Sequence, residues 1–246
     1  MCGLVMRKSG FKFLLLLGLL FSIQKGWGQV SNGDSILRKA SADYLLLMKQ
    51  NASLYNGAEY IAPKQLIEGF PFFGRENYFD GRVITSGVSF FDVPIQYDLV
   101  NDVLLIWSYD RSILLMLNSE KIERFQLGKE SFIRAGLIKQ NDAETHKGFF
   151  QIIHEGQHMA VSKKRKVVVQ KTASDKSYAF YKQFNIYYLI INGDWIQVGS
   201  QKSVINALKD NKDAIKAFIN KQQLNFRKSP EVFLKEVLTY YETLNQ

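Results

Sequence analysis

The spacing of hydrophobic residues along the chain changes twice, and each change predicts a change of secondary structure. Apolar residues recur at helical spacing from Asp34 to Gln50. From Tyr60 to Val198 the chain instead shows short alternating runs rich in aromatic and β-branched residues, separated by turn residues. From Ser200 the helical spacing returns. This order predicts an N-terminal helix, a long series of strands and a C-terminal helical segment.

The predicted strands follow one another through short turns, without helices between them. Pro94 interrupts the first well-defined strand, which indicates an edge strand or a bulge. Asn192-Gly193 follows an alternating apolar run and supplies the two positive-φ residues of a tight hairpin turn. Strands connected in this way form an antiparallel meander. The candidate strands before the hairpin are residues 88–97, 103–107, 113–117, 122–127 and 132–138.

The C-terminal segment has its own start signal at Ser229-Pro230-Glu231, where an N-cap residue, a proline and an acid precede an apolar stripe. We therefore predict a β-dominated α+β fold. It would contain one large curved antiparallel meander sheet, an open roll or half-barrel, with an N-terminal helix and two to three C-terminal helices. Residues 29–246 would form a single β-rich domain, with the helical segment at residues 200–246.

The first 28 residues have the three parts of an export signal. Basic residues precede an eleven-residue apolar run at Phe13–Ile23, and Gly26 and Gly28 place small residues before Gln29. A membrane-spanning helix needs about 20 apolar residues, so we predict a cleaved signal peptide at residues 1–28 and a periplasmic or secreted mature protein. No later segment is long and apolar enough to predict a transmembrane span.

Composition limits the chemistry of the mature chain. The only cysteine, Cys2, lies in the predicted signal, so the mature chain would contain neither disulfides nor cysteine metal ligands. The formal charge is +9, and four basic residues and no acid leave with the signal, which gives about +5. That charge is too small to indicate a nucleic-acid partner, and export argues against one.

Several segments together resemble a group of exported Bacteroidota proteins that carry no assigned function. The resemblance implies an envelope location and supplies neither an activity nor functional residues. The segments that carry it are Gly57 to Tyr60, Gly69 to Gly74, Gly87 to Asp98, Gln201 to Ser203, Lys209-Asp210 and Tyr240-Tyr241.

One motif matches the zinc-hydrolase pattern H-E-x-x-H: His154, Glu155 and His158. On a helix the two histidines would share a face and bind one zinc ion, with the glutamate as general base. Strand-like residues flank the motif, and Gly156 disfavours a helix. A hairpin with a two-residue loop would place the histidines on opposite faces of the sheet, whereas a three-residue loop would bring them together. We predict a hairpin and no cofactor.

Two further clusters are candidate binding surfaces. The basic run Lys163, Lys164, Arg165 and Lys166 is a candidate anion-contacting surface, with a solvated strand edge as the alternative. Aromatic residues near the start of the strand region could line a ligand pocket, with ordinary core packing as the alternative. They are Phe70, Phe72, Phe73, Tyr78 and Phe79.

These observations predict an exported, non-enzymatic envelope protein that acts as a binding or interaction module. Its partner is unknown, with another envelope protein or an amphiphile as candidates. A zinc-dependent hydrolase using His154, Glu155 and His158, and a carrier of an amphiphilic or lipid ligand, are the two alternatives.

Overall fold

The structure is a computed structural model that describes residues 32–48, 53–74, 77–141, 146–173 and 176–244. The predicted signal peptide at residues 1–28 lies outside the described residues. Arg38–Gln246 forms a compact unit of its own, and the residues up to Leu37 belong to a second unit.

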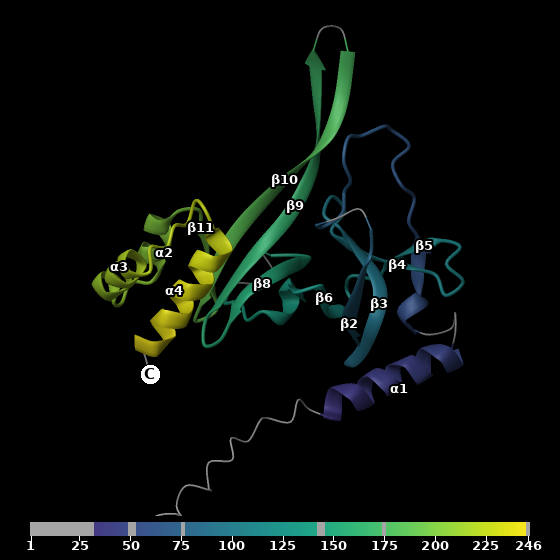
Figure 1. The fold of residues 1–246 in the computed structure, drawn as a ribbon, viewed down its shortest axis with the longest axis horizontal. Coiled ribbons are helices and arrows are strands. Elements are labelled where there is room, and N and C mark those ends of the chain that lie inside the picture. The colour runs from purple at the N-terminus through teal and green to yellow at the C-terminus, as the bar shows by residue number, and fades with distance from the viewer. Residues whose placement is uncertain (1–31, 49–52, 75–76, 142–145, 174–175, 245–246) are drawn as a thin grey trace, which may run out of the picture. The chain divides into compact units, whose positions relative to one another are not determined.

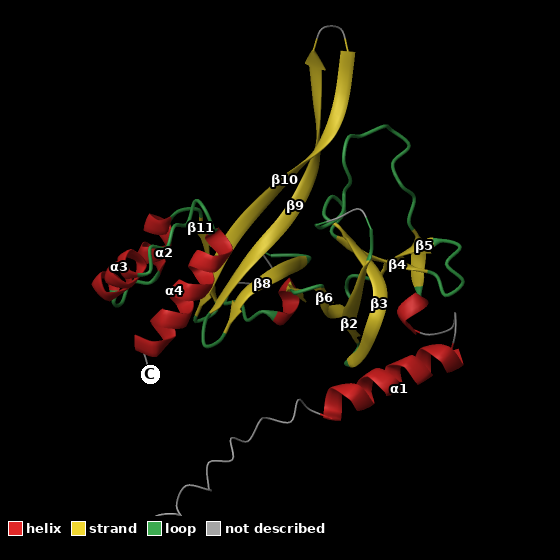
Figure 2. Ribbon diagram, in the orientation of Figure 1, coloured by secondary structure: helices red, strands yellow, loops and turns green. Residues whose placement is uncertain are grey.

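Eleven strands of the described residues form one antiparallel sheet (Figures 1 and 2). The strands are β1 (Gly57–Glu59), β2 (Phe79–Thr85), β3 (Val88–Asp98), β4 (Val103–Trp107), β5 (Leu114–Leu117), β6 (Ile122–Leu127), β7 (Glu130–Arg134), β8 (Phe149–Glu155), β9 (Met159–Ala173), β10 (Lys176–Ile191) and β11 (Asp194–Val198). The described residues also form four α-helices: α1 (Asn32–Met48), α2 (Gln201–Ala207), α3 (Lys212–Lys221) and α4 (Pro230–Leu244). The predicted β-dominated fold, with an N-terminal helix and further helices at the C-terminal end, is confirmed.

The strand order is β1-β5-β4-β3-β2-β6-β7-β8-β9-β10-β11, which departs from a simple meander where β6 pairs with β2. Four strand spacings separate β5 from β6 across the sheet, or about 19 Å if the sheet were flat. The chain from Leu117 to Ile122 reaches at most about 18 Å. The short connection therefore requires the sheet to curl through β2–β5, in agreement with the predicted curvature.

Three hydrophobic clusters stabilise the unit. The first fills the curled part of the sheet and contains the stacked pair Phe125 and Phe132, whose ring centroids are 4.7 Å apart. The second lies between the sheet and helices α2, α3 and α4 and includes Leu189, Leu234 and Leu238. A third, smaller cluster packs around Phe150. The sheet therefore carries its helices over one region and leaves other parts of its surface open.

Most predicted element boundaries agree with the structure. Strands β4 and β6 have the predicted limits, and α4 begins at Pro230. Pro94 lies in an interior strand, but a register irregularity opposite Gly81–Val83 accompanies it, so the bulge alternative is confirmed and the edge alternative is wrong. The predicted strand at residues 132–138 is wrong in its second half, because Ala135–Leu137 forms a 3₁₀ turn.

The Asn192-Gly193 hairpin is also confirmed. Asn192 has φ of 54° and Gly193 has φ of 92°, and the turn joins β10 to β11 with Ile191 opposite Asp194. Among the described residues, no helix is both long enough and apolar enough to cross a bilayer.

Candidate functional site

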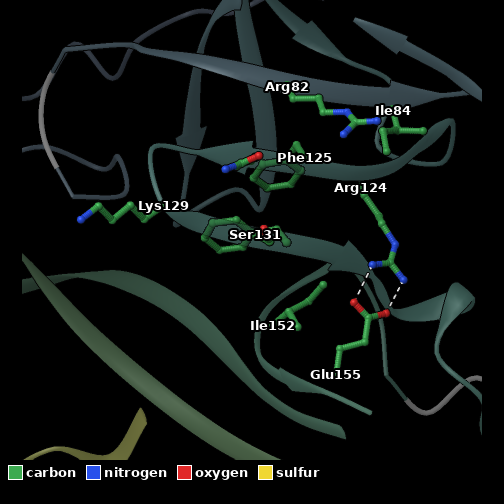
Figure 3. A pocket seen from close by; sticks show the side chains of 10 residues that line it. Arg82, Ile84, Arg124, Phe125, Lys129, Ser131, Ile152 and Glu155 are labelled. Atoms are coloured by element: carbon green, nitrogen blue, oxygen red, sulfur yellow. Dashed lines mark hydrogen bonds and ion pairs between the residues drawn. The ribbon is translucent and has the colours of Figure 1, made fainter. Parts of the chain in front are cut away.

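A pocket of about 370 Å³ opens over strands β2, β6, β7 and β8 (Figure 3). Three cationic side chains and one acid line it, together with two polar and four apolar residues. The lining residues are Arg82, Ile84, Arg124, Phe125, Gln126, Lys129, Ser131, Phe132, Ile152 and Glu155. Its volume lies in the range of sites for small organic molecules.

The register of the sheet explains why these side chains meet. Arg82 lies opposite Gln126, which lies opposite Ser131, and directly opposed residues of antiparallel strands share a face. Ile84 lies opposite Arg124 in the next row. The polar residues of these strands therefore gather on one face, while the intervening Phe125 and Phe132 point their rings into the first hydrophobic cluster.

Arg124 and Glu155 form a two-pronged ion pair at one wall of the pocket (Figure 3). Arg124 Nη1 donates to Glu155 Oε2 at 2.9 Å, and Nη2 donates to Oε1 at 2.6 Å. These hydrogen bonds lower the pKa of Glu155 below its ordinary value of 4.5 and raise the pKa of Arg124. Both side chains are partly exposed to solvent. Glu155 thus already occupies part of the anion-binding capacity of the pocket.

Arg82 is held in a different way. Its guanidinium carbon lies 4.5 Å from the centre of the Phe91 ring, and Nη2 donates to Ser89 Oγ at 3.0 Å. Its Nε atom is buried and has no hydrogen-bond partner among the described residues. Arg82 is thus a fixed cation in the pocket lining, and a planar guanidinium is suited to bind a carboxylate, sulfonate or phosphate oxygen.

The H-E-x-x-H motif does not lie on a helix. Its first two residues end strand β8, and the reversal at Gly156–His158 leads to Met159, which pairs with Glu155. The observed reversal differs from both predicted loops, because Ile153 is an extra residue of a bulge and His154 pairs with Ala160. His154 and Glu155 consequently point to opposite faces of the sheet. The predicted hairpin is confirmed.

Helix α4 holds this hairpin through Glu242. His154 Nε2 lies 3.1 Å from Glu242 Oε2, and the His158 N–H donates to Glu242 Oε1 at 2.8 Å. Thr239 Oγ1 lies 3.4 Å from His154 Nδ1. Among the described residues, no three His, Cys, Asp or Glu side chains are grouped so as to hold a metal ion. The contacts of the two histidines connect the hairpin to the helix.

The predicted basic surface is divided between the two faces of β9. Lys163 donates to Asp102 Oδ2 at 2.6 Å, and burial lowers the pKa of Lys163. Lys164 is buried and pairs with Glu231. Lys166 donates to the carbonyl oxygens of Phe70 and Phe72, at 2.8 and 2.7 Å. Of the four residues, only Arg165 is exposed.

The predicted aromatic cluster is divided as well. Phe73 and Phe79 pack against the first hydrophobic cluster. Phe70 lies beneath Lys166 and Phe72 lies near Tyr60. Tyr78 lines a separate hollow of about 230 Å³ with Pro94, Trp107 and Arg111. These contacts of the five aromatic residues therefore lie in different parts of the described chain.

Sequence reasoning missed the pocket. Alternation indicates that Arg82 and Ile84 share a face, as do Arg124 and Gln126. The pairing of β2 with β6 joins these faces, and consecutive strand order does not reveal it.

Comparison of the chain with protein-family models, curated proteins and solved structures finds no match.

Proposed function

We propose that this chain is an exported, non-enzymatic binding protein whose ligand is a small amphiphilic anion, held in the pocket over β2, β6, β7 and β8. The observation that carries the proposal is the fixed Arg82 guanidinium, which lines the pocket together with Arg124 and Lys129, while Ile84 and Ile152 add apolar surface to the same lining. One acid, Glu155, faces these three cations, so the lining keeps an excess of positive charge.

The charged head group and the apolar body of the proposed ligand each follow from a property of the pocket. The cations favour a negatively charged head group, and charge-assisted hydrogen bonds contribute about 1.5–3 kcal/mol each. The apolar residues favour an aliphatic or aromatic body, at about 25 cal/mol per Å² of apolar surface removed from water. The half-open pocket suits a ligand that is exchanged rather than permanently enclosed.

Calorimetric titration of the chain from Gln29 to Gln246 tests the proposal with three probes. Octanesulfonate has both a charge and an apolar body, inorganic phosphate has only the charge, and octanol has only the body. We expect octanesulfonate to bind most tightly and Arg82→Gln to weaken it about tenfold, as expected for the loss of about 1.4 kcal/mol. Arg227→Gln removes an exposed arginine outside the pocket and should leave the affinity unchanged.

Equal affinity for octanol and octanesulfonate would show that the cations of the pocket do not contribute to binding. Absence of binding by all three probes would refute the assignment of the pocket.

The export part of the proposal rests on the N-terminal pattern of basic, apolar and small residues. Expression of the full chain in a Gram-negative host, followed by fractionation and mass spectrometry, tests it separately. We expect mature protein outside the cytoplasm that begins at Gln29. Full-length protein retained in the cytoplasm would contradict this part alone and leave the pocket assignment standing.

A further inference from the structure

Strands β9 and β10 continue past the rest of the sheet as a two-stranded ribbon (Figure 1). β8 pairs with β9 only up to Ser162, and β11 pairs with β10 only from Tyr187. Beyond these points the two strands pair with each other, and Glu68 forms an isolated bridge to Phe180. A two-stranded hairpin is marginally stable in water by itself, so the surface that this ribbon presents requires a physical account.

Directly opposed residues share a face of the ribbon, and the register divides the side chains into two sets. One set, which we term the basic-aromatic face, lies between Arg165 and Lys171 on β9 and between Tyr178 and Phe184 on β10. It contains three cations, three aromatic rings and two valines, and none of these residues is acidic. Lys163 and Ile186 lie on the same side nearer the rest of the sheet, where Lys163 is paired with Asp102. Tyr178 is 46% exposed and Phe184 is 43% exposed. The opposed pairs of this face are Arg165 with Phe184, Val167 with Lys182, Val169 with Phe180, and Lys171 with Tyr178.

The opposite face of the ribbon makes contacts within the protein. Lys164 pairs there with Glu231, and Lys166 donates to the carbonyl oxygens of Phe70 and Phe72. The exposed positions of this face farther along the ribbon are Val168, Gln170, Thr172 and Ser177. The aromatic rings and the exposed cations are thus concentrated on the face that does not make these internal contacts.

Cations lie beside the rings on the basic-aromatic face. Lys171 Nζ is 5.2 Å from the centre of the Phe180 ring, and Lys182 Nζ is 5.2 Å from the centre of the Phe184 ring. Long cationic side chains keep their heads in water while their stems cover apolar surface. This arrangement lets the rings enter an apolar layer while the ammonium groups remain at its charged boundary.

We propose that the basic-aromatic face docks on the surface of an anionic lipid bilayer. Aromatic rings favour the headgroup region of a membrane, and lysine and arginine are attracted to anionic headgroups. Aromatic and basic residues on strands also bind single-stranded nucleic acid, by stacking of bases on the rings. Val167 and Val169 in the middle of the face favour lipid, because aliphatic side chains gain from acyl chains and offer no ring for a base. The proposal does not depend on the pocket.

Co-sedimentation with vesicles tests the proposal on the chain from Gln29 to Gln246. We expect binding to vesicles that contain phosphatidylglycerol, and much weaker binding to pure phosphatidylcholine. Binding should fall when the salt concentration rises from about 0.1 M to about 1 M, because the screening length falls from about 10 Å to about 3 Å. Similar binding to both kinds of vesicle would overturn the proposal.

Substitutions on the face make the test specific. Lys171→Gln with Lys182→Gln should lower the partition coefficient roughly 25-fold, at about fivefold for each cation. Phe184→Ser should also weaken binding. Lys209→Gln with Lys235→Gln removes two exposed lysines from the helical segment and is the matched control. Arg82→Gln should bind vesicles like the unmodified protein, which separates this proposal from the pocket.

Three results would overturn the proposal: unchanged vesicle binding by the Lys171→Gln and Lys182→Gln protein, preference for single-stranded oligothymidine over vesicles, or a concentration-dependent dimer abolished by Phe184→Ser. Circular dichroism of each variant checks that it is folded, and all of these substitutions except Arg82→Gln lie at exposed positions.

Discussion

His154 and Glu155 are adjacent in the chain, yet His154 contacts Glu242 of helix α4 and Glu155 contacts Arg124 of strand β6. The bulge at Ile153 and the alternation of the strand send the two side chains to opposite faces. In the zinc-hydrolase pattern the glutamate acts on water bound to a metal that the histidines hold. In this protein, by contrast, Glu155 belongs to the wall of the pocket, whereas His154 and His158 contact helix α4.

The ion pair between Arg124 and Glu155 predicts that Glu155 competes with an anionic ligand. Glu155→Gln removes the internal carboxylate, so we expect octanesulfonate to bind about fivefold more tightly to this variant. The change in folding stability should stay below about 1 kcal/mol, because both side chains of the pair are partly exposed. Isothermal titration measures the first effect and urea denaturation the second.

The pH dependence of binding follows from the same pair. The pKa of Glu155 is held below 4.5 by its hydrogen bonds from Arg124. As the pH falls through this lowered pKa, Glu155 takes up a proton and releases Arg124, whereas octanesulfonate stays ionised. Affinity should therefore rise toward low pH in the unmodified protein, and this rise should be missing in Glu155→Gln. The same pH profile in both proteins would contradict the competition.

The contacts of Glu242 with the β8–β9 hairpin predict an effect on folding stability alone. Glu242→Ala leaves the His158 N–H without its acceptor and removes the contact to His154. Loss of a partner by a buried polar group costs about 1–3 kcal/mol, and urea denaturation should show a decrease of that size. Glu242→Gln keeps an acceptor oxygen and should lose less.

Glu236→Ala, at an exposed position of α4, is the control for Glu242. Faster hydrogen exchange of the His158 backbone amide in Glu242→Ala would show that the loss of stability arises at the hairpin. An unchanged free energy of unfolding in that variant would show that the hairpin does not depend on the helix.

Local sequence pattern was sufficient for much of the fold. The limits of β4 and β6 follow from short apolar runs between turn residues, and the β10–β11 hairpin follows from Asn192-Gly193. The start of α4 follows from Ser229-Pro230. Each of these signals acts within a few residues, where backbone preferences and alternation determine the structure.

Features that depend on distant residues could not be read in this way. The pocket needs β2 beside β6, which a sequential meander does not contain. The four residues of the basic run are alike in the sequence, but in the fold Lys164 pairs with Glu231 and Lys166 donates to the carbonyl oxygens of Phe70 and Phe72. Burial of these lysines depends on segments about 70 and 100 residues away, as Lys164 to Glu231 and Lys166 to Phe70 show.

The turn at Gly193 predicts a strong preference for glycine. Its φ of 92° is unfavourable for other residues, and an added Cβ would lie 2.5 Å from Asn141 Oδ1. Asn141 also donates to the carbonyl oxygen of Asn192 at 3.0 Å. We expect Gly193→Ala to lower the free energy of unfolding by about 1–2 kcal/mol or more.

The matched control for this turn is Gly199→Ala. An added Cβ there meets no atom within 4 Å, and the backbone is not in the left-handed region. This substitution should be neutral or stabilising by up to about 1 kcal/mol, because it restricts the unfolded chain. Equal destabilisation by the two alanine substitutions would refute the argument from backbone conformation.

His146 predicts a pH-dependent signal on the sheet surface. Its ring stacks on Trp195 with 4.2 Å between centroids and 12° between planes, and burial lowers its pKa below 6.5. The unfolded state therefore takes up the proton at higher pH than the folded state, so the contribution of His146 to stability is present above pH 6.5 and is lost as the pH falls through the lowered pKa.

A protonated imidazole in contact with indole quenches its fluorescence. Titration of the mature chain carrying Trp107→Phe should show quenching of Trp195 with a midpoint below 6.5, and His146→Gln should abolish it, whereas a midpoint at or above 6.5 would contradict the effect of burial.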